Sequence, residues 1–388
     1  MPDQMISRLA ARGVRFPAPQ LTYLSPDLVP ERFHEGAVVH PFCRIEGADS
    51  ALGPGAEVGA EGPVTLRSCQ LGAGAGVASG FADRCTLLDG ARAGAGFHGR
   101  PGTLMEEFSG VAHSVGLKQT VLFPFVEFGS LVNFCDAIVS GGTGPGDHSE
   151  VGSSYVHFNF TPHGDKATAS LVGDVPRGAL LRAPRIFLGG QGGLVGPRRV
   201  AFGAVVPAGT VLRRDVAREG ALVRNSPPSG GPDREWDPAN FGRVRERADA
   251  CLEYLGNVLA LRAWYDVARA PFMRRTPWGA ACLEGARERV ASIWKERVKR
   301  LRVLFEKAAA AGAGLFSAEE NALAALEARW TAGPAAPAAG SPAAAALEAL
   351  AAAPDAATWP AAVQSLPPES ASALAAWLRG VSDFKSNI

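Results

Sequence analysis

The amino-acid sequence predicts a mainly β fold, a left-handed parallel β-helix of hexapeptide repeats, followed by an α-helical C-terminal region. Aliphatic residues recur six positions apart, as in Leu52 and Val58 and again in Val200, Val206 and Leu212, often beside glycine. This period matches neither the 3.6-residue repeat of a helix nor the two-residue repeat of a strand. It fits a triangular coil in which one side chain in six points inward. A flexible Gly/Ala-rich linker, the alternative, would not hold aliphatic residues at a fixed phase.

The composition changes along the chain and divides it into four expected segments. The hexapeptide pattern is interrupted twice, and interruptions of a solenoid usually form loops on one face, often the binding face. The expected segments are an N-terminal lead-in over 1–32, a β-helix over 33–230 with inserted loops at about 97–125 and 159–166, a helical domain over 231–332, and an Ala/Pro-rich linker with short helices over 333–388.

The helical domain begins where the pattern changes to helical spacing. Asp237 and Pro238 fit an N-cap and a first helical position, and further helices are expected over 278–311 and 318–330. Between Phe241 and Lys307 there are 15 basic and 8 acidic side chains. This surplus indicates either a solvated helical face or a basic surface for an anionic substrate or partner.

Charge and cysteine content exclude several classes of protein. The chain of 388 residues has 39 basic and 38 acidic side chains, so no overall charge favours nucleic acid or a membrane surface. No apolar run reaches the length of a membrane helix, and the N-terminus lacks the features of a signal peptide. The six cysteines contain no CxxC pair. We therefore expect a soluble cytoplasmic protein rather than a secreted disulfide scaffold, a zinc ribbon or an integral membrane protein.

A polar cluster marks the candidate site. Histidine is the natural general base near neutral pH, and His148 would fill that role if Asp147 or Glu150 oriented it; a solvated corner histidine is the alternative. His157 and Asn159 share one face of a strand, so His157 either acts on substrate or has a structural role. The cluster consists of Asp147, His148, Ser149, Glu150, His157, Asn159, His163, Asp165 and Lys166. With three repeats of six per coil, these residues are expected along one edge of two neighbouring coils.

The segments LVGPRRVAFGAVVPAGTVLRRD (194–215) and DAIVSGGTGPGDHSEVGSSYVHFNFTP (136–162) resemble a known family. They are similar to the acetyltransferase domain of the bacterial bifunctional UDP-N-acetylglucosamine pyrophosphorylase/glucosamine-1-phosphate N-acetyltransferase. The resemblance implies acetyl-CoA as acyl donor, a sugar substrate and a homotrimer with sites between neighbouring prisms. The nucleotidyltransferase half of that family has no counterpart in this chain, so uridylyltransferase activity is not expected.

The resemblance also implies roles for individual residues. Asp136 stands where the family has its general-base histidine, Val139 where it has a substrate tyrosine and Glu150 where it has a substrate asparagine. Asn159 stands where the family also has an asparagine, and Lys166 falls near the family's substrate lysine. The resemblance implies that the coenzyme lies along the late coils, with the pantetheine near Ala204 and Gly209 and a phosphate on Arg224. Six arginines make this end of the prism positive, and they either suit a polyphosphate or decorate the outer faces: Arg182, Arg185, Arg198, Arg199, Arg213 and Arg214.

The sequence therefore predicts a coenzyme A-dependent acyltransferase acting on a sugar phosphate or nucleotide sugar. The expected catalytic residues are His148, His157, Asp136 and Glu150, the substrate ligands are Asn159, Lys166 and His163, and the coenzyme ligands are Ala204, Gly209 and Arg224. The alternative is a non-catalytic β-helix that serves as a scaffold or binds a nucleotide sugar. The replaced base favours the alternative, whereas the polar cluster favours the enzyme. No HxH or HExxH spacing indicates a metal site, and neither nucleic acid nor membrane is expected as a partner.

Overall fold

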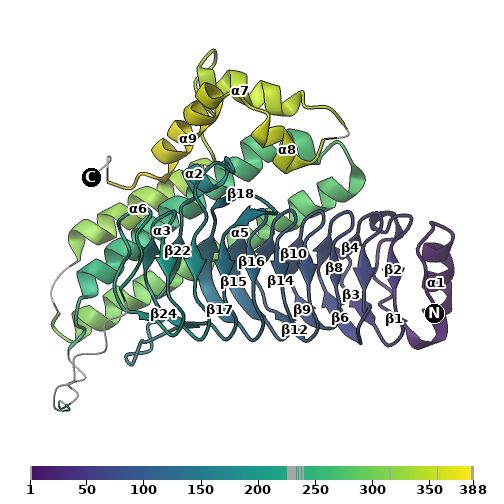
Figure 1. Cartoon of the computed structure of the whole chain (residues 1–388), viewed down its shortest axis with the longest axis horizontal. Coiled ribbons are helices and arrows are strands. Elements are labelled where there is room, and N and C mark those ends of the chain that lie inside the picture. Colours follow the sequence, from purple (N-terminus) through teal and green to yellow (C-terminus); the bar gives the residue numbers. More distant parts are fainter. Residues whose placement is uncertain are drawn as a thin grey trace.

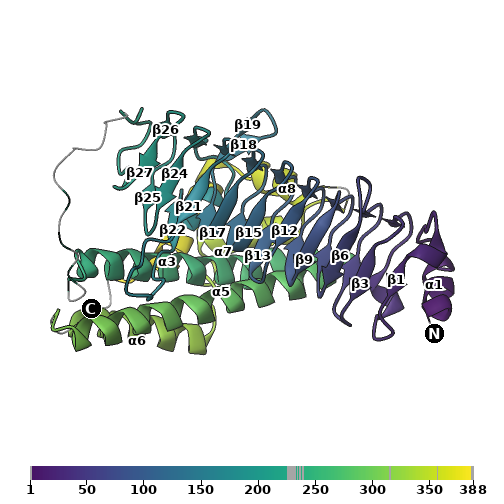
Figure 2. The ribbon, with the colours of Figure 1, turned by 90° about the horizontal axis from the view of Figure 1, so that it is seen from below.

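The computed structural model describes residues 2–224, 240–313, 316–355 and 357–385, together with Asp233, Glu235 and Asp237. A parallel β-helix of about 11 turns forms the first part of the chain, which confirms the predicted fold class. Helices from the C-terminal part lie along one side of the β-helix (Figures 1 and 2). The expected boundary between the β-helix and the helical domain, at 230–231, lies outside the described residues.

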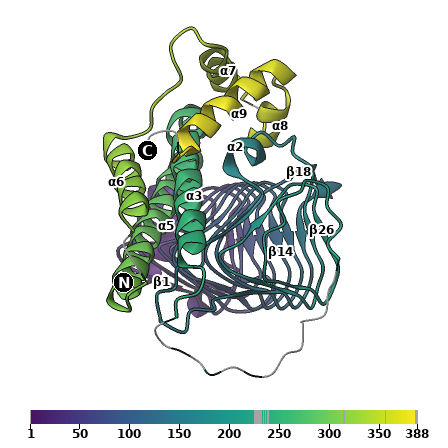
Figure 3. The ribbon, with the colours of Figure 1, turned by 90° about the vertical axis from the view of Figure 1, so that its left-hand side faces the viewer.

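The β-helix is a three-sided prism, and its end-on view shows the three faces (Figure 3). Each coil runs from face A to face B to face C, and we name the corners AB, BC and CA after the faces that they join. Face A contains β1 (Tyr23–Leu24), β3 (Arg44–Glu46), β6 (Val64–Arg67), β9 (Gly80–Asp83), β12 (Phe97–Gly99), the first halves of β15 (Gly116–Leu122) and β17 (Asn133–Val139), β21 (Val156–Phe158), β24 (Gly193–Val195) and β27 (Val211–Leu212).

Faces B and C complete each coil. Face B contains β4 (Ala51–Leu52), β7 (Gln70–Leu71), β10 (Cys85–Leu87), β13 (Thr103–Met105), the second halves of β15 and β17, β22 (Ser170–Val172) and β25 (Arg199–Val200). Face C contains β2 (Val38–Val39), β5 (Glu57–Val58), β8 (Gly76–Val77), β11 (Arg92–Ala93), β14 (Gly110–Val111), β16 (Glu127–Phe128), β20 (Glu150–Val151), β23 (Phe187–Leu188) and β26 (Val205–Val206).

Aliphatic side chains fill the inside of the prism and explain the six-residue period. Val39, Val58 and Val77 stack in register on face C and are fully buried. Because every strand pairs with the strand of the next coil, the backbone groups of the interior are hydrogen-bonded from coil to coil. The core is therefore a column of small aliphatic layers that runs along the prism.

Two expectations about the β-helix are wrong: the inserted loop at 97–125 and the start at residue 33. The segment 97–125, expected as an inserted loop, forms four strands, β12 to β15, that pair in register with their neighbours. Beside Gly102, its corners place four residues other than glycine in the left-handed region, namely Phe108, Ser114, Gln119 and Phe125, so the glycine pattern weakens while the coil continues. The β-helix also begins before residue 33, because β1 already pairs with β3.

Three insertions interrupt the coils, and they lie at two different corners. A short hairpin of β18 (Gly142–Gly144) and β19 (Asp147–His148) projects from the BC corner. In the next coil, the segment 159–169 projects from the AB corner, at the position where a loop was expected. The same coil carries α2 (Val175–Gly178) at its BC corner. The coil that contains the last two insertions therefore follows directly on the coil that carries the hairpin.

The helices divide into a cap and a C-terminal group. The first helix, α1 (Pro2–Ala10), lies at the N-terminal end of the prism (Figure 1), and one-turn helices η1 (Pro19–Leu21) and η2 (Pro30–Arg32) follow it. The first long helix begins at Val244 instead of Asp237, and Pro238 lies outside the described residues. The C-terminal group is α3 (Val244–Ala263), the π-helical segment η3 (Trp264–Arg269), α4 (Ala270–Met273), α5 (Pro277–Ala310), α6 (Ser317–Ala332), α7 (Pro342–Ala351), α8 (Trp359–Gln364) and α9 (Pro368–Ser382).

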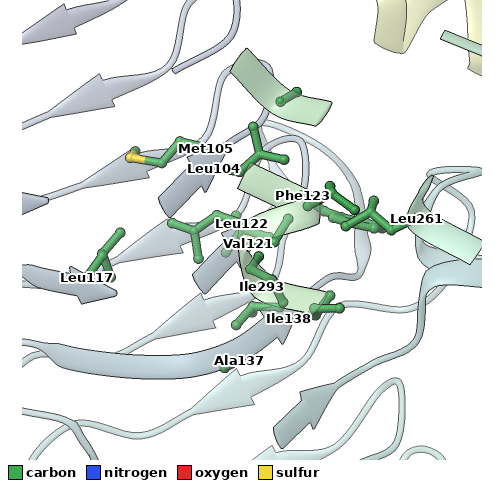
Figure 4. Close-up of a cluster of buried hydrophobic side chains, with 14 of the residues drawn as sticks. Leu104, Met105, Leu117, Val121, Leu122, Phe123, Ala137, Ile138, Leu261 and Ile293 are labelled. Atoms are coloured by element: carbon green, nitrogen blue, oxygen red, sulfur yellow. The ribbon is translucent and has the colours of Figure 1, made fainter. Parts of the chain in front are cut away.

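Helix α5 covers face B. The outward residues of this face, among them Leu104, Val121 and Ile138, are buried and in register, and Ile293 of α5 lies over them (Figure 4). Gly285 of α5 permits this close approach, because a Cβ at this position would lie 2.0 Å from Oε1 of Gln70 on face B. Face B is therefore part of the interior, whereas faces A and C stay open.

Candidate functional site

The structure separates the predicted polar cluster, so the expectation that it lies along one edge is wrong. His148 belongs to the hairpin at the BC corner, whereas Lys166 belongs to the 159–169 insertion at the AB corner. Face B and the helices that cover it lie between these two corners (Figure 3). The insertions lengthen the coils beyond the 18-residue period, which is why counting in sixes placed the residues together.

The BC corner carries a histidine with neighbouring carboxylates. Nδ1 of His148 lies 2.8 Å from the carbonyl oxygen of Pro145, which can only accept, so Nδ1 carries the proton and Nε2 is the basic nitrogen of the neutral ring. Glu150 lies in register with Glu127 on face C. Burial raises the pKa of Glu127, and the charges of His148 and Glu150 also act on it. These groups form a half-exposed acid–base cluster.

Neither predicted carboxylate orients His148 directly. The carboxylate of Asp147 accepts a hydrogen bond from the hydroxyl of Thr143, at 2.8 Å, and lies 3.6 Å from the guanidinium of Arg185. The ring is held by the main chain of its own hairpin instead. A backbone carbonyl therefore takes the place of an orienting carboxylate, and the role of His148 as a general base stays a prediction.

His157 lies inside the prism rather than on a substrate-facing surface. It is 5% exposed, packs beside Phe134 and has its Nε2 2.8 Å from the hydroxyl of Ser170. Burial, with a smaller effect of the Arg297 charge, lowers its pKa to about 3. A ring that stays neutral and is enclosed in the core fits the structural role that was the alternative to catalysis.

We expect His157 to remain neutral across the range in which ordinary histidines titrate. Its ring ¹³C and ¹⁵N chemical shifts, followed by NMR from pH 4.5 to 8, should stay constant, because protonation would place a charge in the core. The protein unfolded in urea serves as the control, because burial no longer acts on the ring there. A titration of His157 in this range would show that the ring is accessible to solvent and would restore it as a candidate base.

Asp136 forms a buried ion pair with the helical region. Its Oδ1 lies 3.0 Å from Nη2 of Arg297 of α5, and both side chains are less than a tenth exposed. Burial raises the pKa of Asp136, and the charges of Arg297 and Lys118 oppose that effect. The carboxylate of Asp136 thus binds a cation of its own chain, and sequence reasoning missed this partner.

The AB corner of the last coils contains a pocket rich in arginine. It has a volume of about 440 Å³ and lies between the prism and the first turn of α3. We call it the arginine pocket, and its lining residues are Pro197, Arg198, Arg213, Arg214, Asp215, Arg243, Glu246, Arg247 and Ala250. Five arginines face two carboxylates, so the pocket is positively charged. The first N–H groups of α3 add a partial positive charge to the same place.

Arg198 is the arginine whose surroundings most favour an anion. Burial lowers its pKa, and the like charge of Arg243 acts in the same direction, whereas the charges of Asp215 and Glu246 oppose this effect. Its Nε is buried and makes no hydrogen bond within the described parts of the chain. A bound anion would supply the acceptor that this Nε lacks.

The predicted substrate ligands lie at the same AB corner as the arginine pocket. Asp165 is fully buried and pairs with Arg247 of the pocket, and Lys166 follows it as an exposed residue. His163 stacks on Phe241, with ring centroids 3.8 Å apart. The amide oxygen of Asn159 accepts a hydrogen bond of 2.6 Å from Thr168. Arg247 was not singled out from the sequence, where the basic surplus of the helical region was its only signal.

The predicted coenzyme ligands lie elsewhere, on face C and the CA corner. Ala204 is fully buried, and its role beside the pantetheine stays a prediction. Gly209 is open, because a Cβ there would have no neighbour within 4 Å, and Arg224 is exposed. Val205 and Leu222 are bridge partners on face C, and both expose their apolar side chains to solvent.

The fold and this corner define a hexapeptide-repeat β-helix protein with a positively charged pocket. No family model matches the chain. It is similar to the bifunctional protein GlmU of Pelobacter propionicus, with 26% identity over 230 residues, covering 56% of this chain and 43% of the relative. The corresponding proteins of Streptomyces avermitilis and Nocardia farcinica are 28% and 29% identical, covering 55% and 59% of this chain and 39% and 41% of the relatives. The chain thus spans about two fifths of the length of these relatives.

Within the described ranges, no helix has the length and apolar character needed to cross a membrane. Among the same residues, no group of three or more His, Cys, Asp and Glu side chains is arranged to hold a metal ion.

Proposed function

We propose that this protein is a coenzyme A-dependent acyltransferase that acts on a sugar phosphate or a nucleotide sugar. The observation that carries the proposal is the arginine pocket, which shares the AB corner with Asn159 and Lys166. Arginine guanidinium groups and a helix N-terminus are the groups that proteins use for phosphate. The similarity to GlmU proteins supports acyl transfer as the reaction, with acetyl-CoA as the donor.

The catalytic base in this proposal is His148. Its Nε2 is the basic nitrogen of the neutral ring, and it would take the proton of the acceptor amine or hydroxyl as that group attacks the thioester carbonyl. Glu127 and Glu150 lie on the adjoining face C, where their carboxylates are in register. His157, enclosed in the core, has no part in the transfer.

Two neighbouring chains are needed to bring the base and the arginine pocket together. In one chain they lie at opposite edges of face B, which α5 covers. If three prisms pack face A against face C around their CA corners, the AB corner of one chain meets the BC corner of the next. His148 and Lys166 lie in successive coils, and strands of successive coils are about 4.8 Å apart. The homotrimer expected from the resemblance is compatible with this arrangement, with the helices outside.

Coenzyme binding is expected to depend on the arginine pocket. In calorimetric titrations with acetyl-CoA, the double variant Arg213→Ala/Arg214→Ala should bind at least about tenfold more weakly than wild type, because two phosphate partners are lost. Arg92→Ala, an exposed arginine on face C of the early coils, is the matched control and should bind normally. Arg224→Ala tests the phosphate ligand that the resemblance implies. Absence of binding to the wild-type protein would contradict the proposal.

A second function is a non-catalytic β-helix that binds a nucleotide sugar. The observation that favours it is the ion pair of Asp136 with Arg297, which fills the place of the family's base. Thiol release from acetyl-CoA, measured with a panel of amino sugars and nucleotide sugars, separates the two functions. Release that is lost in His148→Ala but kept in His157→Ala supports the enzyme. Saturable binding of UDP-sugars without thiol release supports the second function.

A further inference from the structure

A second cavity lies at the BC corner of the early coils, away from the arginine pocket. It has a volume of about 380 Å³ and is enclosed by the corner turns after β10 and β13, by α4, by the first turns of α5 and by the start of α8. We call it the acidic cavity. Its wall includes Asp89, Glu107, Phe272, Trp278, Cys282 and Trp359.

One carboxylate oxygen in the acidic cavity lacks a partner. Glu107 is 5% exposed, and its Oε1 pairs with Arg269. Its Oε2 is also buried but makes no hydrogen bond within the described chain. A buried carboxylate oxygen without a donor is costly. The oxygen therefore points to a donor that the described residues do not supply.

The carboxylates around the acidic cavity outnumber the cations. Asp89 and Glu107 line the cavity, and Glu106 lies behind them, where it accepts a hydrogen bond of 2.6 Å from the hydroxyl of Tyr265. Arg269 is the buried guanidinium shared by Glu106 and Glu107. Burial, and then the charge of Glu107, raises the pKa of Asp89 to about 6.

The remaining charged and titratable groups of the cavity do not cancel this excess. Arg275 lines the rim, but its guanidinium donates to the carbonyl oxygens of Ala351 and Ala353 and lies 3.8 Å from Asp355. The thiol of Cys282 is kept protonated by burial and by the charges of Asp89 and Glu107, which raise its pKa. The cavity therefore attracts positive charge at neutral pH.

Aromatic rings supply the rest of the wall. Phe272 and Trp359 meet edge to face with centroids 5.3 Å apart, and Trp278 stands at the start of α5. Trp359 already accepts one cation, since the guanidinium carbon of Arg269 lies 5.0 Å from its ring centroid. Aromatic faces beside carboxylates are the surroundings in which proteins hold organic ammonium groups.

We propose that the acidic cavity is a binding site for a small organic cation, a protonated amine on a short aliphatic chain. The ammonium group donates to Oε2 of Glu107 and to the carboxylate of Asp89, and the aliphatic part packs on Trp278, Phe272 and Trp359. This site goes beyond the proposed acyl transfer, because it lies in earlier coils and at a different corner from the arginine pocket. A failure of one proposal leaves the other untouched.

Putrescine (1,4-diaminobutane) and its neutral isostere 1,4-butanediol are the probes that test the site. In calorimetric titrations of the full chain at pH 7.5, putrescine should bind saturably and butanediol should not. Glu107→Gln, which removes the charge and keeps the shape, should weaken putrescine binding by at least about tenfold. Glu127→Gln, a half-buried carboxylate on face C, is the matched control and should bind like the wild type.

A second variant and a pH series keep the test decisive if Glu107→Gln fails to fold. Asp89→Asn retains the acceptor for the amide of Ala73, at 2.7 Å, and should also weaken binding. Binding of putrescine to the wild type should weaken as the pH falls from 7.5 to 5.5, because Asp89 and Glu106, whose pKa values burial raises to about 6 and about 7, become protonated. No binding of putrescine, equal binding of butanediol, or full binding to both variants would overturn the proposal.

Discussion

Replacing Arg269 by methionine is expected to lower the free energy of unfolding at pH 8 by about 3–5 kcal/mol. The guanidinium is fully buried, lies 3.1 Å from the carboxylate of Glu106 and pairs also with Glu107. Methionine fills much of the same volume but leaves two carboxylates in the interior without their cation. Such a loss is larger than that of most single substitutions, which cost roughly 0.5–3 kcal/mol.

The loss should depend on pH in a defined direction. In the wild type, burial raises the pKa of Glu106 to about 7, while the carboxyl of the unfolded chain titrates near its ordinary value. A raised pKa in the folded state means that stability falls as the pH rises between these two values. Without Arg269 this effect grows, because the ionised forms have lost their partner. The deficit of Arg269→Met should therefore be smaller at pH 5 than at pH 8.

Urea denaturation followed by circular dichroism at the two pH values measures this deficit. Arg302→Met is the matched control on α5, since Arg302 forms an exposed pair with Glu327 at 2.8 Å. Exposed pairs contribute roughly 0–1 kcal/mol. If Arg269→Met lowers the free energy of unfolding at pH 8 no more than Arg302→Met does, the guanidinium of Arg269 does not stabilise the buried cluster.

The second large effect concerns the ion pair between the prism and α5. Arg297→Leu should lower the free energy of unfolding by about 3–5 kcal/mol, because it leaves the carboxylate of Asp136 buried and unpaired. Asparagine at position 136 removes that charge and tolerates the left-handed backbone of this corner, where φ is 60°. The double variant Asp136→Asn/Arg297→Leu should therefore be more stable than Arg297→Leu alone.

A double-mutant cycle at neutral pH gives the coupling between the two residues. Contacting charged residues usually show coupling of roughly 0.5–3 kcal/mol, and this pair should fall at the upper end because both side chains are less than a tenth exposed. Additive effects of the two substitutions would mean that Asp136 is available to another partner. That result would return Asp136 to the list of candidate catalytic groups.

The repeat could be predicted from the sequence because it reflects one physical requirement, an aliphatic side chain inside each face of each coil. Val39, Val58 and Val77 meet that requirement with short side chains and nearby glycines, so the period is visible. Over 97–125 the requirement is still met, but corner residues such as Phe108 and Gln119 adopt the left-handed backbone without glycine. The pattern that indicates a corner is then missing, although the corner is present.

The candidate site was less predictable, because it depends on contacts between distant parts of the chain. His148 and Lys166 appear as neighbours when coils are counted in sixes, but the insertions place them at different corners. Asp136 appears as an open carboxylate until Arg297, on a helix much later in the sequence, is placed beside it. Hydrophobic periodicity indicates which side of an element is buried, and it carries no information on which later helix covers that side.

The covering of face B by α5 has a consequence for synthesis of the protein on the ribosome. The strands that carry Leu104, Val121 and Ile138 are made well before Ile293, which covers them. At a synthesis rate of about 5–20 residues per second, on the order of 10–30 s pass between the synthesis of Ile138 and that of Ile293. During that interval the nascent coils present an apolar sheet surface on which a second nascent chain could associate. The yield of folded protein should therefore depend on how quickly translation reaches α5.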